Sequence, residues 1–202
     1  MRIVWFPLLG FVLFSGLESM AQELTVSPTG TASEAVNVLR ACLVARDDQF
    51  GSSDLCIGLV DQPCQSANSN YNECIRIEAA AWGTIVAEEF RMTLVFSAEG
   101  DAFDTNSDPG FDSRAETLCA SQSAWRAYVE ADCTNAYAQW GEGSMRQTAG
   151  LQCALRKNAQ RAVELRGRRA YSVDQFQAWA KASATSIRAA FPVSCAALDD
   201  IR

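Results

Sequence analysis

Two cysteines enclose the segment CTNAYAQWGEGSMRQTAGLQC, residues 133–153, whose centre is the glycine-rich stretch Gly141 to Ser144. Apolar side chains recur at helical spacing before and after this stretch, which predicts two helices joined by a short loop. Cys133 and Cys153 then lie on facing helices, close to the loop. We therefore predict a Cys133–Cys153 disulfide that staples a helical hairpin and contributes about 3 kcal/mol to stability by restricting the unfolded chain.

Helical patterns extend over the chain on both sides of this hairpin. A capping box, Ser113 to Glu116, opens the helix that ends at Cys133, and a second one, Ser172 to Gln175, opens a C-terminal helix before Pro192. No segment alternates like a β-strand. The predicted fold is an all-α bundle of about five or six helices, stapled by disulfides. The other helices are expected from Ser33 to about Leu43, from Asp54 to Val60, from Tyr71 to about Phe96, and from Leu151 to Arg166-Gly167.

Helix geometry also restricts the pairing of the other cysteines. Cys119 and Cys133 lie 14 residues apart on one helix. That separation is about 21 Å at 1.5 Å per residue, which is too far for a disulfide. Cys119 is therefore assigned to Cys195. The first four cysteines allow three connectivities, of which we favour Cys56–Cys64 together with Cys42–Cys74.

The first 21 residues have the pattern of a secretory signal peptide. Arg2 supplies a positive charge, residues 3–17 are mostly apolar, and Ser19-Met20-Ala21 is a small-x-small cleavage site. The apolar run is shorter than the roughly 20 residues that a membrane-spanning helix needs, and no cysteine at the cleavage point offers a site for a lipid. We expect a single mature domain, residues 22–202, in a bacterial periplasm or outside the cell, with no membrane anchor.

The composition favours binding over catalysis. The chain carries 24 Asp and Glu against 17 Lys and Arg, a net charge of −7. This charge disfavours nucleic acid as a partner and favours a basic protein. Because the chain has no histidine, it lacks the commonest catalytic base and every His-bearing metal site, and it contains no Cys-x-x-Cys redox motif. We expect no enzyme activity and no cofactor.

Acidic side chains crowd the region from about residue 99 to residue 116. This region is either a docking surface for a basic partner or an ordinary solvated loop. Within it, Asp104, Asn106 and Asp108 have the spacing that opens an EF-hand calcium loop, although Pro109 stands where that motif needs glycine. An ordinary turn is the alternative interpretation. The candidate partner-binding residues of this region and of the glycine-rich turn are Asp101, Asp104, Asp108, Asp112, Glu142 and Ser144.

A basic stretch and three tryptophans remain to be placed. The basic side chains either bind a phosphate or a cell-wall polymer, or they stabilise the carboxyl end of a helix through its macrodipole. Trp82, Trp125 and Trp179 lie on apolar stripes, so we expect them in the core. The basic residues are Arg156, Lys157, Arg161, Arg166, Arg168 and Arg169.

Several of these residues form a recognisable pattern. The second half of the chain carries Gln122-x-x-Trp125, Cys133, Gly143-Ser144, Cys153 and Arg161-Ala162-x-x-Leu165, and the first half carries Cys56-Ile57-Gly58, Glu78 and Trp82. With this spacing, residues 56–165 resemble the lysozyme inhibitor LprI N-terminal domain family of exported bacterial proteins.

The resemblance implies an exported helical binding protein that inhibits a basic cell-wall hydrolase such as a lysozyme by occluding its cleft. The alternative is a non-catalytic structural or stress-accessory protein with no lysozyme target. Several positions depart from the family pattern, which usually has polar residues there. If those polar residues form the family's functional surface, this chain has a changed activity. The departures are Gly83, Ala87, Phe90, Ser123 and Val129.

Overall fold

The computed structural model describes residues 32–46, 53–67, 70–105, 110, 112–170 and 195. Every regular element in these ranges is a helix, which confirms the all-α prediction. The helices are α1 (Ala32–Ala45), α2 (Ser53–Cys56), α3 (Asp61–Ala67), α4 (Tyr71–Thr105), α5 (Arg114–Ala138) and α6 (Arg146–Ala170).

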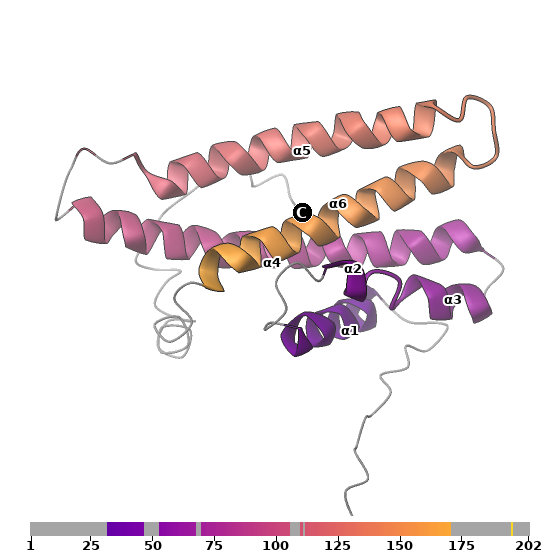
Figure 1. Cartoon of the computed structure of the whole chain (residues 1–202), viewed down its shortest axis with the longest axis horizontal. Coiled ribbons are helices and arrows are strands. Elements are labelled where there is room, and N and C mark those ends of the chain that lie inside the picture. Colours follow the sequence, from indigo (N-terminus) through magenta and orange to yellow (C-terminus); the bar gives the residue numbers. More distant parts are fainter. Residues whose placement is uncertain are drawn as a thin grey trace, which may run out of the picture.

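The long helix α4 is the axis of the bundle (Figure 1). Its 35 residues extend about 52 Å at 1.5 Å per residue. α5 and α6 form the predicted hairpin, and α6 lies against both α4 and α5, whereas α1 and α3 pack on α4 from the other side. The core lies along α4, where Trp82, Ile75 and Ile85 are fully buried.

Several helix boundaries differ from the sequence-based expectation. α2 ends at Cys56 rather than Val60, α5 continues beyond Cys133 to Ala138, and α6 begins at Arg146 rather than Leu151. α4 continues beyond Phe96 to Thr105, and α6 continues through Gly167 to Ala170. A glycine inside a helix costs about 1 kcal/mol, which buried contacts on both sides of it can offset. Pro63 does not stop the chain but occupies the first turn of α3, where a missing N–H is tolerated. The predicted signal peptide, the predicted helix from Ser172 and Trp179 lie outside the described residues.

Three disulfides each connect two of these helices, and a fourth joins α5 to Cys195. Cys133 is joined to Cys153 and Cys119 to Cys195, with Cα–Cα distances of 5.4 and 5.8 Å, as the helix geometry predicted. The favoured pairing of the first four cysteines was wrong. The structure joins Cys42 to Cys56 and Cys64 to Cys74, with Cα–Cα distances of 5.9 and 5.6 Å. The reason is the position of α3, which lies against α4, while α2 lies against α1.

Candidate functional site

The family-pattern residue Glu78 is fully buried and joins α4 to the start of α3. Its carboxylate accepts hydrogen bonds from the backbone amides of Gly58, Val60 and Asp61, at 2.8, 3.0 and 2.7 Å. It also accepts one from Trp82 Nε1 at 3.3 Å. Gly58 has φ = 92°, a left-handed conformation that favours glycine, in the turn that supplies these amides. Glu78 therefore anchors a loop and is not available to a partner.

A second cluster of family-pattern residues joins α5 to α6. Arg161 is only 3% exposed, and its Nε donates to Gln122 Oε1 at 2.9 Å. Its guanidinium forms an ion pair with Glu164 at 2.9 Å and lies 5.6 Å from the centroid of the Trp125 ring. Burial opposes ionisation of Glu164, but its bonds to Arg161 and Arg168 lower the pKa of its carboxyl group. Because the buried polar groups of Gln122 and Arg161 are hydrogen-bonded to each other, this cluster holds α5 and α6 together.

Three of the basic side chains between Arg156 and Arg169 also join α6 to other helices. Glu89 on α4 is buried and forms ion pairs with Arg166, at 3.2 Å, and with Arg169. Lys157 forms an ion pair with Asp132 on α5 at 2.9 Å. Neither sequence interpretation of this stretch foresaw these internal partners, since they come from helices distant in the sequence. Arg156 and Arg168 are exposed, and Arg168 pairs with Glu164 on its own helix.

The acidic region is partly used within the fold. Asp101, near the end of α4, accepts hydrogen bonds from the backbone amides of Arg114 and Ala115 at 2.8 and 2.9 Å, and from the hydroxyl of Ser113 at 2.9 Å. Ser113 in turn caps α5 by accepting from the amide of Glu116, as the capping box predicted. Asp112 is exposed beside this cap. Asn106, Asp108 and the side chain of Asp104 lie outside the described residues.

The cap formed by Asp101 predicts a pH-dependent stability. Partial burial opposes ionisation, but the hydrogen bonds from Ala115, Arg114 and Ser113 outweigh it and lower the pKa of Asp101 below its usual 3.8. A carboxyl group whose pKa is lower in the folded state stabilises the fold above the unfolded-state pKa, and this contribution is lost as the pH falls through the folded-state pKa.

Asp101→Asn is therefore expected to lower the free energy of unfolding at pH 7 by about 0.5–1 kcal/mol, a modest value because solvent screens this carboxylate. The difference in the free energy of unfolding between this variant and the wild type should vanish when the pH is below the folded-state pKa of Asp101. Urea unfolding at pH 7, 4 and 2.5 measures it, and a constant difference across this range would contradict the capping role.

The second half of the hairpin lies outside the core. The buried residues of α5 are Ala115, Leu118 and Gln122, so no residue of α5 after Gln122 is buried. We call residues 126–153, which comprise the end of α5, the turn and the start of α6, the distal hairpin. The Cys133–Cys153 disulfide joins its two helices. This surface therefore contributes little to the core, although it is held in place.

Polar and aromatic contacts complete the attachment of the distal hairpin. Lys157 Nζ donates to the Tyr128 hydroxyl at 2.6 Å and lies 4.5 Å from the centroid of its ring. Its hydrogen bonds to Tyr128 and Asp132 raise the pKa of Lys157 above its ordinary value. At the start of α6, Thr148 donates to Asn72 on α4 at 2.7 Å. The hairpin is thus fixed by a few specific bonds.

The turn of the distal hairpin is tight and carries an exposed aromatic side chain. Gly141 has φ = 51°, and the amide of Gly143 donates to the carbonyl of Trp140 at 2.7 Å. A Cβ atom on Gly143 would lie 2.8 Å from that carbonyl oxygen, so the turn requires glycine there. Trp140 is 52% exposed and Met145 is 45% exposed. Glu142 and Ser144, the candidate residues of the turn, are exposed beside them.

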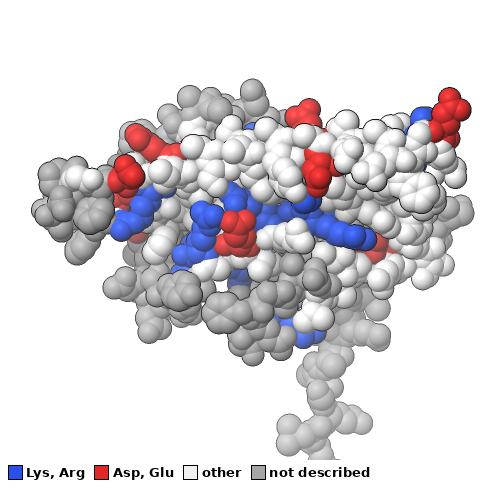
Figure 2. Space-filling model, turned by 45° about the horizontal axis from the view of Figure 1, so that its top comes forward, with Lys and Arg blue, Asp and Glu red and all other residues white. Residues whose placement is uncertain are grey.

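The part of the distal hairpin around the turn, residues 134–145, is poor in charge compared with the rest of the chain. Figure 2 shows Lys and Arg side chains in a band across the middle of the face, whereas the surface toward the turn is mostly uncharged. Residues 134–145 contain one charged side chain, Glu142. Exposed aromatic and methionine side chains with few charges are the composition of the central part of protein–protein interfaces.

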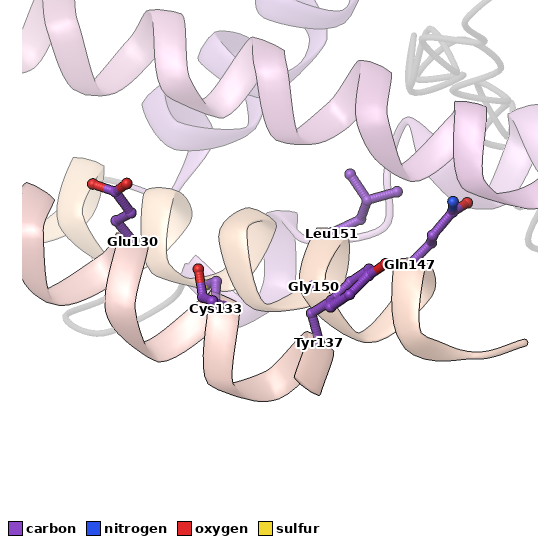
Figure 3. Close-up of a pocket in the computed structure, with 7 residues that line it drawn as sticks. Glu130, Cys133, Tyr137, Gln147, Gly150 and Leu151 are labelled. Atoms are coloured by element: carbon purple, nitrogen blue, oxygen red, sulfur yellow. The ribbon is translucent and has the colours of Figure 1, made fainter. Parts of the chain in front are cut away.

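A groove of about 520 Å³ runs along one side of the distal hairpin, between α5 and α6. Figure 3 shows Glu130 at one end and Tyr137 beside Gln147 at the other, with Cys133 between them. Gly150 and Leu151 line the α6 side. The groove is open to solvent, and Glu130 is the acidic residue among those that line it.

The buried residues Glu78 and Arg161 and the turn at Gly141 all lie within a segment that matches a known protein family. Residues 62–165, about half of the 202-residue chain, match the family Lysozyme inhibitor LprI. The chain belongs to this family. No match is found among the curated proteins or the solved structures. Membership of the LprI family indicates a function of the lysozyme-inhibitor type.

The LprI-family pattern in this chain falls on residues that build the scaffold. Glu78 and Trp82 anchor α3, Gln122 and Arg161 join α5 to α6, and Gly143 shapes the turn. Leu165 is buried, and its carbonyl accepts a hydrogen bond from Thr93 at 3.1 Å. Of the departures from the pattern, Phe90 is buried in the core, Gly83 faces Asn158 on α6, Ala87 and Val129 are half-buried and Ser123 is exposed.

The described ranges contain neither a membrane-spanning helix nor a cluster of metal-ligating side chains. No helix there combines the length and the apolar character needed to cross a membrane. No three His, Cys, Asp or Glu side chains of the described residues gather closely enough to hold a metal ion.

Proposed function

We propose that this protein is an exported, non-catalytic inhibitor of a basic cell-wall hydrolase of the lysozyme type, and that the distal hairpin contacts the enzyme. The observation that carries the proposal is the exposed Trp140 on a tight, hydrogen-bonded turn. A large aromatic side chain held at the end of a stapled hairpin loses little conformational freedom on binding. Such a residue fits the cleft in which a hydrolase binds its substrate.

The charge and the disulfides support this proposal. The chain has a net charge of −7, and an acidic protein is steered toward a basic enzyme by long-range attraction. Four disulfides suit an oxidising compartment, in agreement with the secretory pattern of residues 1–21. The absence of histidine from the whole chain favours binding over catalysis.

The direct test is muramidase activity with and without a stoichiometric amount of the mature protein, for several lysozyme classes. Inhibition should be stronger at low ionic strength than at physiological salt, because salt screens the attraction between the two proteins. If no lysozyme class is inhibited at micromolar protein, the proposal fails and a structural or stress-accessory role remains.

Trp140→Ala is expected to weaken inhibition about thirtyfold, which corresponds to about 2 kcal/mol for the loss of a central aromatic contact. The fold should be unaffected, since the side chain is half exposed. The matched control is Leu55→Ala, which removes a similarly exposed apolar side chain from α2. The measurement is the inhibition constant of each variant. Equal constants for Trp140→Ala and Leu55→Ala would show that Trp140 does not contact the enzyme.

A further inference from the structure

We propose that the groove of the distal hairpin receives a lysine or arginine side chain of the partner enzyme. This inference rests on the proposed function, because it identifies the part of a basic partner that the hairpin contacts beside the turn. The groove has mostly apolar walls and a carboxylate, that of Glu130, at one end. A long side chain with an apolar stem and a cationic head matches that arrangement.

The length of the groove suits such a side chain. Glu130 and Tyr137 lie seven residues apart on α5, about 10 Å along the helix axis. A side chain that enters beside Tyr137 lays its stem along Gly150 and Leu151, and its cationic head approaches Glu130 (Figure 3). The stem then buries apolar surface while the charge remains near solvent.

Glu130 is available for a new partner. No hydrogen bond or ion pair joins its exposed side chain to another described residue. Most other carboxylates of the described ranges already have internal partners: Glu73 pairs with Arg76, Glu88 with Arg40, Glu89 with Arg166 and Arg169, Asp132 with Lys157, and Glu164 with Arg161 and Arg168. A cation at Glu130 therefore gains a charge-assisted hydrogen bond without breaking an existing one.

The positive charge of Arg146 determines in which direction the partner's lysine or arginine side chain lies in the groove. The Arg146 guanidinium lies 5.4 Å from the centroid of the Tyr137 ring, at the end of the groove away from Glu130. Like charges repel, so the cationic head is disfavoured beside Arg146 and favoured beside Glu130. The stem consequently lies against Tyr137 and the head against Glu130.

The first test measures the dissociation constant of the full-length mature protein and a basic lysozyme that it inhibits. Glu130→Gln should raise this constant about tenfold, as expected for the loss of one charge-assisted hydrogen bond. The matched control is Glu116→Gln, at the exposed start of the same helix, which changes the net charge equally and should change the constant less than twofold. Equal effects of the two variants would overturn the groove proposal and leave the proposed function standing.

The second test does not depend on any lysozyme. Backbone amide shifts of the full-length mature protein are followed by NMR during titration with N-acetyl-lysine methylamide and, separately, with the uncharged N-acetyl-norleucine methylamide. The lysine compound should shift the amides of residues 130–137 and 147–151 in the wild type but not in Glu130→Gln. Equal shifts with both compounds, or no shifts at the groove, would overturn the proposal. Groove binding without lysozyme inhibition would refute the proposed function alone.

Discussion

Glu78→Gln is expected to lower the free energy of unfolding by about 3 kcal/mol, because it disrupts a fully buried carboxylate that accepts four hydrogen bonds. Three of the donors are backbone amides at the entry to α3. The side-chain NH₂ group of glutamine would face N–H groups that now donate to the carboxylate. Two donors cannot form a hydrogen bond with each other. The charge-assisted bonds are lost and buried amides remain without an acceptor.

Urea unfolding followed by circular dichroism measures this effect. The matched control is Glu73→Gln on the same helix, since Glu73 is only partly buried and forms its ion pair with Arg76 one turn away. The control should unfold at the same urea concentration as the wild type. If Glu78→Gln is as stable as the control, the anchoring role of Glu78 is wrong.

Replacing both Cys133 and Cys153 by serine is the second change with a large expected effect. The disulfide closes a loop with a sequence separation of 20, which is worth about 3 kcal/mol in the loop-entropy account. Because no residue of α5 after Gln122 is buried, the other contacts between the two helices of the distal hairpin are mainly the partly exposed ones of Lys157 with Tyr128 and Asp132. We therefore expect a lower melting temperature and at least tenfold faster hydrogen exchange at residues 126–153.

The control for this pair is the double variant Cys42→Ser/Cys56→Ser, which opens a disulfide with a sequence separation of 14 between α1 and α2. It should lower global stability by a comparable amount, yet leave exchange in the distal hairpin unchanged. If hydrogen exchange in the distal hairpin is as slow in the Cys133→Ser/Cys153→Ser variant as in the wild type, the disulfide does not hold the hairpin in position.

Local patterns in the sequence predicted the parts of the fold that depend on neighbouring residues. The capping box at Ser113 and the hairpin with its Cys133–Cys153 disulfide are examples, because helix spacing alone places both cysteines beside one turn. The partners of Cys56 and Cys64, which are Cys42 and Cys74, could not be obtained in this way. They depend on the position of α3 against α4, where Glu78 binds a loop 17 to 20 residues earlier in the chain.

The candidate binding surface was predicted only in part. The glycine-rich turn with Glu142 and Ser144 was identified, but Trp140 was not. Trp140 continues the helical spacing of Cys133 and Tyr137, so periodicity alone places it in the core. It is exposed because α5 extends beyond the residues that bury its first half. No pattern in the sequence indicated that Asp101, a candidate partner-binding residue, accepts hydrogen bonds from the backbone amides at the start of α5.

The most direct test of the central claim is hydroxyl-radical footprinting of the mature protein, alone and mixed with a basic lysozyme that it inhibits. Trp140 and Met145 are exposed and readily oxidised in the free protein. Val44 on α1 and Leu55 on α2 are exposed references, since neither helix adjoins the turn between α5 and α6 (Figure 1). We predict that the lysozyme suppresses oxidation of Trp140 and Met145 and leaves Val44 and Leu55 unchanged. Undiminished oxidation of Trp140 in the inhibited complex would contradict the claim that the distal hairpin contacts the enzyme.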